Sequence, residues 1–324
     1  MKERVKWIDS AKGILMIMVI LGHSLAETSY KSPFYHGYLL VFRLITLFHM
    51  PAFFIITGYL MANREWKTIP AVIYLKRKLV KLMIPYLIFE GIAIVLLVFV
   101  LRFKSFKKAM IDTLCLKCNL GADWFLVTMF FAACLFFFIV RSIDSKRLLL
   151  IVAVLSIVMA CICNRESHIQ ILIGRSLLAL CFMVIGYLWG DERYIAIINK
   201  PLYLTLIMLA MLAIAIFNGP VSMYDISMGN LKTMFVLGAI LGTILIVCAS
   251  KKRTSRVFEK IGLNSLVIMG VHQHIVYVAR SLNLSIYGLI PTMALFASML
   301  AYSLTIVEGY SYIRSKVNST RIRL

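Results

Sequence analysis

Residues 8–26 read IDSAKGILMIMVILGHSLA, and this segment carries the two features that organise our interpretation of the chain. It is an apolar run of about 20 residues, the length at which a helix crosses a membrane. Two ionisable side chains, Lys12 and His23, interrupt it. Such groups cost roughly 2.5–3.5 kcal/mol each at the centre of a bilayer. The segment therefore predicts a membrane-spanning helix whose polar residues serve a purpose.

Similar apolar runs follow along the whole chain. Of its 324 residues, 61% are hydrophobic, against about 45–50% in a typical soluble domain. No stretch is polar enough to form a separate soluble domain, so we predict one all-α integral membrane domain over residues 1–324. Its ten predicted spans, a polytopic helix bundle, cover residues 8–26, 38–61, 79–101, 122–140, 148–163, 169–189, 201–217, 231–249, 264–281 and 289–307.

The formal net charge of +21 comes from 35 Lys and Arg against 14 Asp and Glu. With ten spans, both termini lie on one side, and most basic residues outside the spans share that side. Because cytoplasmic loops are enriched in Lys and Arg, both termini are predicted to be cytoplasmic. Nucleic-acid binding is not predicted, since no polar domain remains to present the charge. The basic residues 102–117 do not fit this pattern, and indicate either an amphipathic segment on the bilayer surface or a misplaced boundary.

Lys12 and His23 are predicted to share one face of the first helix. They are eleven residues apart, which at about 100° per residue is three turns plus about 20°. Their separation along the axis is roughly 16 Å. The face thus holds a cation near the cytoplasmic side and an imidazole much deeper, and an imidazole is suited to general-base chemistry. The alternative is structural: Lys12 extends to the interface and His23 bonds a neighbouring helix.

Other polar residues lie at the ends or inside predicted spans. A basic cluster at the third span could bind phosphate groups or anchor the span near anionic lipid. The two histidines at 272 and 274 are about 200° apart on a helix and do not form a paired metal site. Cys115 and Cys118 form a CxxC without a second pair, so no metal is predicted. Besides Lys12 and His23, the residues that we regard as candidates for a functional site are Asp9, His49, Tyr59, Arg77, Lys78, Lys81, Asp123, Trp124 and His272.

Four stretches, in this order, resemble the acyltransferase-3 family of bacterial membrane O-acyltransferases, and within it the branch of fucose 4-O-acetylase-like proteins. The resemblance extends over almost the whole chain and includes its ten-span layout. The four stretches are WIDSAKG at 7–13 with His23; FHMPAFF at 48–54 with TGY at 57–59; Lys78 and Lys81 with Pro85 and Tyr86; and WFL at 124–126.

The resemblance implies a multi-pass enzyme of the bacterial plasma membrane that takes an acyl group, usually acetyl, from cytoplasmic acyl-CoA. The acceptor is a hydroxyl of a cell-envelope glycan or glycolipid, and no cofactor is permanently bound. His23 falls on the essential histidine and Lys12 on its basic partner, with Asp9 three residues before Lys12. Lys78 and Lys81 fall on a basic pair that is usually arginine, so these two residues, Lys12 and Arg77 are expected to contact the phosphates of acyl-CoA.

The acceptor side is predicted from the remaining candidates: Trp124 and Asp123 contact the sugar, and His49, Tyr59 and His272 line the cavity. A transporter or flippase, including an assembly factor for polysaccharide export, would use the same buried polar residues for a substrate or proton path. A non-catalytic scaffold or sensor is the third alternative, and it predicts that Lys12 and His23 can be replaced together without loss of function.

Overall fold

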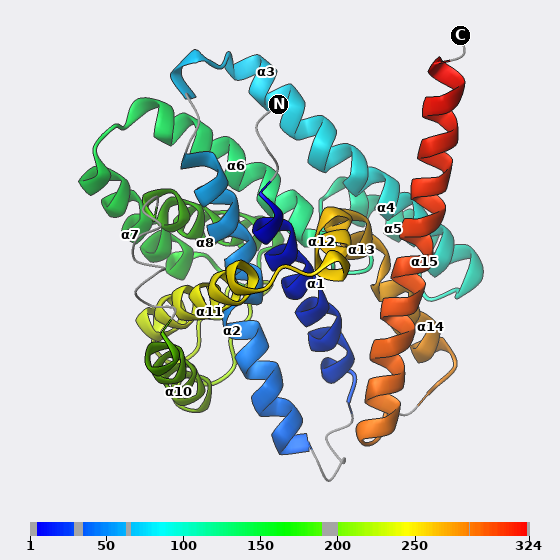
Figure 1. The fold of residues 1–324 in the computed structure, drawn as a ribbon. Coiled ribbons are helices and arrows are strands. Elements are labelled where there is room, and N and C mark those ends of the chain that lie inside the picture. The colour runs from blue at the N-terminus through cyan, green and yellow to red at the C-terminus, as the bar shows by residue number, and fades with distance from the viewer. Residues whose placement is uncertain (1–4, 29–34, 63–65, 190–199, 285, 323–324) are drawn as a thin grey trace. The chain divides into compact units, whose positions relative to one another are not determined.

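The computed structural model describes residues 5–28, 35–62, 66–189, 200–284 and 286–322 (Figure 1). Its elements are helices, and over these ranges the β-structure consists of one bridge between Ser222 and Ser227. The predicted all-α class is therefore confirmed. The chain forms two compact units: unit 1 comprises Met1–Leu39 with Arg253–Leu324, and unit 2 comprises Leu40–Lys252.

Unit 1 brings the first helix together with the last part of the chain. In Figure 1, α1 lies beside α12, and it also contacts α13 and α15. The segment of α12 bends by 66° against the segment formed by α13 and α14. α14 in turn packs against α15. The helices of unit 1 are α1 (Lys6–Ala26), α12 (Arg256–Leu263), α13 (Ser265–Val271), α14 (Gln273–Ser281) and α15 (Leu289–Ile322).

Unit 2 holds most of α2 and the helices up to α11. Residues 71–100 form one continuous helical segment, in which two π-helical stretches, η2 and η3, interrupt the α-helix. Its elements are α2 (Tyr35–Ala62), η1 (Trp66–Thr68), α3 (Ala71–Lys78), η2 (Leu79–Met83), α4 (Ile84–Ile94), η3 (Val95–Val100), α5 (Phe106–Leu114), α6 (Trp124–Ser142), α7 (Lys146–Ile162), α8 (His168–Leu188), α10 (Pro201–Phe217) and α11 (Lys232–Lys252).

Glycines allow two helices of unit 2 to touch backbone to backbone. A Cβ atom at Gly58 of α2 would lie 1.9 Å from the carbonyl oxygen of Met183 in α8. The reverse contact places a Cβ at Gly186 of α8 1.9 Å from the carbonyl oxygen of Ile55. Small residues are enriched at membrane helix interfaces because they permit such close approach.

Seven helical segments of the described chain are long and apolar enough to cross a membrane, and the bent pair α12 with α13–α14 raises the number to eight. α7 and α10 occupy two further predicted spans but have 17 residues each. A helix is present at each of the ten predicted spans. That the chain crosses the membrane ten times stays a prediction. The orientation of the termini also stays a prediction.

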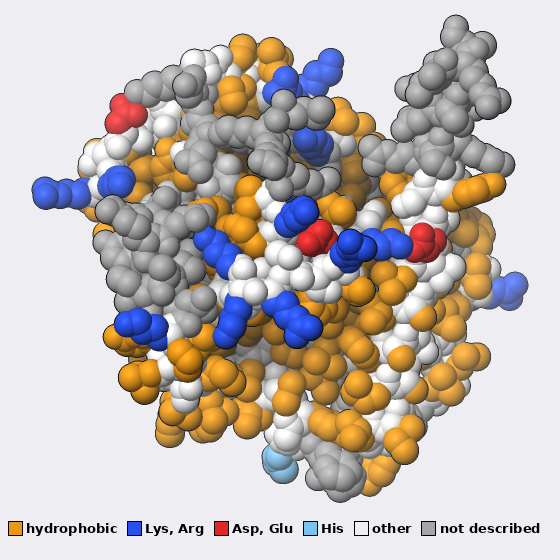
Figure 2. Space-filling view, in the orientation of Figure 1, with side chains coloured by type: hydrophobic (Ala, Val, Ile, Leu, Met, Phe, Trp, Pro, Cys, Tyr) orange, Lys and Arg blue, Asp and Glu red, His pale blue; other side chains and the backbone are white. Residues whose placement is uncertain are grey.

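The described surface is that of a protein in contact with lipid. Hydrophobic side chains predominate on the face drawn in Figure 2, and large apolar residues such as Ile290 and Val72 are 82% and 77% exposed. Soluble monomers rarely expose apolar patches of more than a few hundred Å². The exposed apolar side chains of α4, α7 and α10 are those that a bilayer would cover.

The basic residues 102–117 contain a short amphipathic helix, α5. Its residues Ala109 and Thr113 are buried, whereas Phe106, Ile111 and Leu114 are exposed. Ser105 caps the helix by accepting a hydrogen bond from the backbone N–H of Lys108. The structure places a short helix here, and its position on the bilayer surface stays a prediction.

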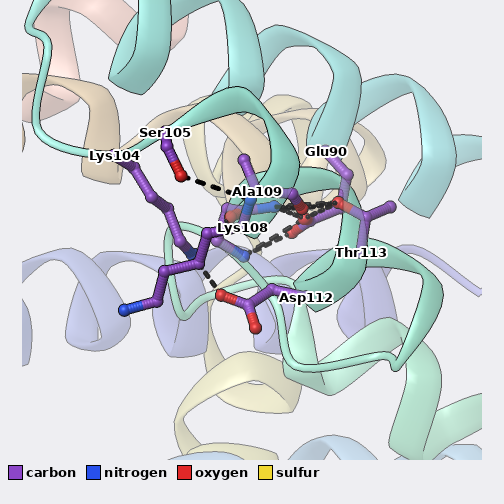
Figure 3. A network of polar contacts seen from close by, with 8 residues as sticks. Glu90, Lys104, Ser105, Lys108, Ala109, Asp112 and Thr113 are labelled. Carbon is purple, nitrogen blue, oxygen red and sulfur yellow. Dashed lines mark hydrogen bonds and ion pairs between the residues drawn. The ribbon is translucent and has the colours of Figure 1, made fainter.

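A buried carboxylate, Glu90 of α4, holds α5 and the loop after it (Figure 3). Thr113 Oγ1 donates to Glu90 Oε2 at 2.8 Å, and the Asn119 backbone N–H donates to Oε1 at 2.9 Å. The Asn119 side-chain amide adds a bond to Oε2 at 2.5 Å. Because a buried charge is tolerated only when it is paired or hydrogen-bonded, this network explains how Glu90 can be fully buried within an apolar segment.

We expect Glu90→Ala to destabilise the protein strongly, because it leaves the buried backbone N–H of Asn119 without an acceptor and removes the bonds of the Thr113 and Asn119 side chains to the carboxylate. At about 1–3 kcal/mol for each unsatisfied group, the thermal midpoint in detergent should fall by at least ~5 °C. Ser105→Ala in the same loop removes one exposed capping bond and should change the midpoint much less. Equal midpoints for the two variants would contradict the assigned role of Glu90.

Candidate active site

The position of α1 in unit 1 is set by a backbone contact with α12. A Cβ atom at Gly13 of α1 would lie 2.0 Å from the carbonyl oxygen of Phe258. A Cβ at Gly262 of α12 would lie 1.8 Å from the carbonyl oxygen of Asp9. No residue other than glycine fits at either position without moving a helix. The pair therefore holds the polar segment of α1, including Asp9, against α12.

His23, the predicted base, meets a residue from the other end of the chain. The side-chain amide nitrogen of Gln273, the first residue of α14, lies 3.1 Å from His23 Nδ1 and 3.2 Å from Nε2. Gln273 is 8% exposed. Its amide can donate a hydrogen bond to whichever ring nitrogen carries the lone pair. His23 therefore has a hydrogen-bonding partner from the break between α13 and α14.

His272, the residue before Gln273, lies beside the same ring. The ring centroids of His23 and His272 are 5.0 Å apart. His272 is fully buried and its Nδ1 lies 2.9 Å from the carbonyl oxygen of Ile268. A carbonyl only accepts, so Nδ1 carries the hydrogen and Nε2 carries the lone pair. That Nε2 atom has no hydrogen-bond partner within the described part of the chain.

His274 points to a different partner from His272, as the helical spacing predicts. Its Nδ1 atom lies 3.0 Å from the hydroxyl of Tyr302 in α15. The ring of His272, by contrast, contacts α1. The two histidines therefore do not converge on one point, and they bind different helices of unit 1.

Two polar contacts connect the end of α1 to α14 and α15. Arg280 of α14 donates two hydrogen bonds to Glu27, from Nε at 2.9 Å and from Nη2 at 2.5 Å. The hydroxyls of Thr28 and Thr292 are 3.0 Å apart. A bidentate guanidinium–carboxylate pair fixes orientation as well as distance. The pair lies one helical turn beyond His23, so it stabilises the contact of His23 with Gln273.

Lys12 and His23 both belong to α1, which is a single uninterrupted α-helix. The geometry from which their shared face was predicted is therefore confirmed. Asp9 is buried in the first turn of this helix, and Lys12 is partly buried. Their roles as catalytic or donor-binding residues stay predictions.

The predicted phosphate-binding residues other than Lys12 belong to unit 2. Arg77 and Lys81 are exposed, and the Lys78 ammonium lies 5.4 Å from the centre of the Tyr74 ring. Lys78 ends α3, and Lys81 lies in the π-helical turn η2, so the angle between the two side chains differs from that in an α-helix. Their contact with the phosphates of acyl-CoA stays a prediction.

Two predicted cavity residues, His49 and Tyr59, lie on α2 in unit 2 and are partly buried. The Nδ1 atom of His49 lies 2.8 Å from the carbonyl oxygen of Ile45, one turn earlier. Its Nδ1 therefore carries the hydrogen, since the carbonyl can only accept. Contacts of these two residues with an acceptor stay predictions.

Trp124 is the first residue of α6, and Asp123 is the N-cap residue before it. Both are more buried than residues that bind a sugar at the protein surface. Trp124 is 8% exposed, and Asp123 is fully buried. Neither carboxylate oxygen of Asp123 has a hydrogen-bond partner among the described residues. The indole ring of Trp124 instead contacts Phe125, Tyr224 and the guanidinium of Arg175. The predicted sugar contact stays a prediction, and it requires that a ligand reach a buried pair.

Sequence reasoning missed Gln273 and Glu90. Gln273 lies between His272 and His274, but its side-chain amide is neutral, so no buried charge in the sequence indicates a functional role. Glu90 is an acidic residue inside an apolar span, which is a usable signal.

The second cysteine of the CxxC at Cys115 and Cys118 is not a reactive thiolate. Burial and the nearby Glu90 raise the pKa of the Cys118 thiol well above its usual range.

Comparison with protein families matches residues 5–307 to the acyltransferase domain that defines one family. The match includes α1, the break between α13 and α14, and the start of α6. Neither the curated proteins nor the solved structures in the comparison contain a match to this chain.

We expect Gly262→Ala to lower stability sharply, because its added methyl group would lie 1.8 Å from the Asp9 carbonyl oxygen. Overpacking of this kind typically costs about 1–3 kcal/mol or more. The matched control is Gly309→Ala in α15, where nothing lies within 4 Å of the added Cβ. Thermal denaturation of both variants in detergent measures the difference. A Gly262→Ala protein as stable as the control would contradict the assigned contact between α1 and α12.

Proposed function

The chain belongs to the acyltransferase-3 family of membrane proteins, and we propose that it transfers an acetyl group from acetyl-CoA to a hydroxyl of a cell-envelope glycan or glycolipid. The proposed location is the bacterial plasma membrane. In this proposal His23 is the general base. The observation that carries it is the contact of His23 with Gln273 and His272, which gives a histidine inside an apolar span a defined hydrogen-bonding environment.

The chemistry requires one proton acceptor. The acceptor hydroxyl oxygen attacks the thioester carbonyl carbon, and His23 takes the hydroxyl proton as the new C–O bond forms. The C–S bond then breaks, and the leaving thiolate receives that proton to give free CoA thiol and the ester. His23 ends in its starting state, so no further reactant is needed.

In this proposal, Gln273 selects which nitrogen of His23 acts, since its side-chain amide lies within 3.2 Å of both ring nitrogens. An amide presents either its N–H groups or its oxygen to the ring, because a half-turn about the Cγ–Cδ bond exchanges the two. With its oxygen toward the ring, Gln273 accepts the imidazole N–H and leaves the other nitrogen with a free lone pair. That arrangement is the one a general base needs. We therefore assign Gln273 as the residue that positions His23.

The remaining candidates keep the roles that the resemblance implies. Lys12, Arg77, Lys78 and Lys81 are proposed to bind the phosphates of acetyl-CoA as point charges or, for Arg77, in a bidentate manner. Asp9 is proposed to orient Lys12. Asp123, Trp124, His49, Tyr59 and His272 are proposed to contact the acceptor.

We expect His23→Ala to reduce acetyl transfer by at least ~100-fold, since general-base catalysis contributes about 10²–10⁴-fold. The assay follows labelled acetyl groups from acetyl-CoA into glycan or glycolipid in membranes with matched expression. The matched control is His36→Ala, because His36 is an exposed histidine of unit 1. It should retain activity close to that of the wild type. Full activity in His23→Ala would refute the proposed base.

The same assay separates the enzyme from a transporter or flippase. A transporter could use the same buried polar residues but would not move labelled acetyl groups into an acceptor. Transfer that depends on His23 supports the enzyme. Movement of a substrate across the membrane without consumption of acetyl-CoA would support the transporter instead.

We expect Gln273→Leu to lower kcat roughly tenfold, the equivalent of about 1.4 kcal/mol. The apolar side chain cannot orient the ring of His23, whereas donor binding should be preserved. The KM for acetyl-CoA should therefore stay within about twofold. Gln170→Leu is the control, since Gln170 is an exposed glutamine that accepts a bond from Asn164. An unchanged kcat, or a change in KM alone, would show that Gln273 does not act through His23.

A further inference from the structure

Arg175 is a buried cation without a carboxylate partner. It lies in α8, seven residues or roughly 10 Å along the helix axis after its first residue, His168. It is 4% exposed. Its guanidinium makes one long hydrogen bond, from Nε to the carbonyl oxygen of Ile171 at 3.4 Å, and no ion pair among the described residues. The terminal amino groups therefore have donors to offer.

Other arginines of this chain show what a satisfied guanidinium looks like. Arg141, at the end of α6, donates to the carbonyl oxygen of Ile69 at 2.6 Å. Arg280 binds both carboxylate oxygens of Glu27. Ionisable residues inside membrane spans pair with one another or with backbone carbonyls, and they mark the paths of substrates or ions. Arg175 has one long bond to a carbonyl and no ion pair among the described residues, which leaves most of its donors for a ligand.

Two adjacent aromatic rings, Trp124 and Tyr224, contact Arg175. Its Cζ atom lies 5.6 Å from the Trp124 ring centre and 4.9 Å from that of Tyr224. Such cation–π contacts contribute about 0.5–2 kcal/mol, but they leave hydrogen bonds unmade because the N–H donors lie in the guanidinium plane. The nearby acid Asp225 accepts a hydrogen bond from Ser222 at 2.9 Å. The rings thus hold the guanidinium without occupying its donors.

We propose that Arg175, which packs against Trp124 and Tyr224, binds an anionic oxygen group, a carboxylate or a phosphate, carried by the acceptor. Assigning this anion to the acceptor rests on the proposed function, whereas the anion site itself does not. The planar guanidinium fork matches carboxylate and phosphate geometry bidentately. Asp123, next to Trp124, supplies two unbonded carboxylate oxygens that can accept hydrogen bonds from sugar hydroxyls. An acidic sugar satisfies both residues at once.

The test measures binding to the full-length protein in detergent, without acetyl-CoA. Intrinsic tryptophan fluorescence is followed during titration with glucuronate, inorganic phosphate or glucose at constant ionic strength. We expect a saturable change with an anion and none with glucose, and the change should be lost in Trp124→Phe. Tighter binding of glucuronate indicates an acidic sugar, and tighter binding of phosphate indicates a phosphate-bearing acceptor.

The variants decide whether Arg175 is the ligand. Arg175→Gln should raise the Kd of the anion at least tenfold, and Arg175→Lys, which keeps the charge but loses the fork, should raise it severalfold. Arg165→Gln is the matched control, since Arg165 is exposed in the same unit and donates to the carbonyl oxygen of Ile226. If Arg175→Gln does not give a monodisperse protein, Arg175→Lys alone decides.

Absence of saturable anion binding, or equal affinity in wild type and the Arg175 variants, would overturn the site. This outcome is distinct from failure of the proposed function. Anion binding that depends on Arg175, in a protein whose acetyl transfer does not depend on His23, keeps the anion site and removes its assignment to an acetyl acceptor.

Discussion

In an apolar environment a buried polar group can find a partner only within the protein, and the polar contacts of this structure follow from that constraint. Glu90 is buried in a membrane-length helix because Thr113 and Asn119 surround its carboxylate with donors. The same constraint explains why ring nitrogens of His49 and His272 bond the carbonyl one turn earlier. Where such a group is left with unused donors, as at Arg175, or with unbonded oxygens, as at Asp123, a ligand is the natural candidate.

Close helix packing makes these partnerships possible in each unit. In unit 1, Gly13 and Gly262 let the backbones of α1 and α12 touch. The chain then bends by 66° between α12 and α13, and Gln273 begins α14 after a second interruption at His272. A helix end places side chains more freely than a helix interior. This is how an amide 250 residues away in sequence reaches the ring of His23.

The two units carry different parts of the proposed chemistry. Unit 1 contains the base, His23, with the residues that position it and with Lys12. Unit 2 contains the basic cluster at Arg77, Lys78 and Lys81, together with the aromatic-flanked Arg175. The π-helical turn at Lys81 is also in unit 2, and single π turns inside α-helices are frequent at functional sites. The family match extends across both units.

The sequence by itself determined the helical class, the membrane setting, and the position of the long apolar helices, because hydropathy and helical period are local properties of the chain. It also identified His23 and Lys12, since charge inside an apolar run is visible without a fold. Only the tertiary structure decided that Gln273 contacts His23, that Asn119 binds Glu90, and that Arg175 packs against two aromatic rings. Those contacts join residues far apart in sequence, and they depend on glycine packing and helix breaks whose geometry no local pattern encodes.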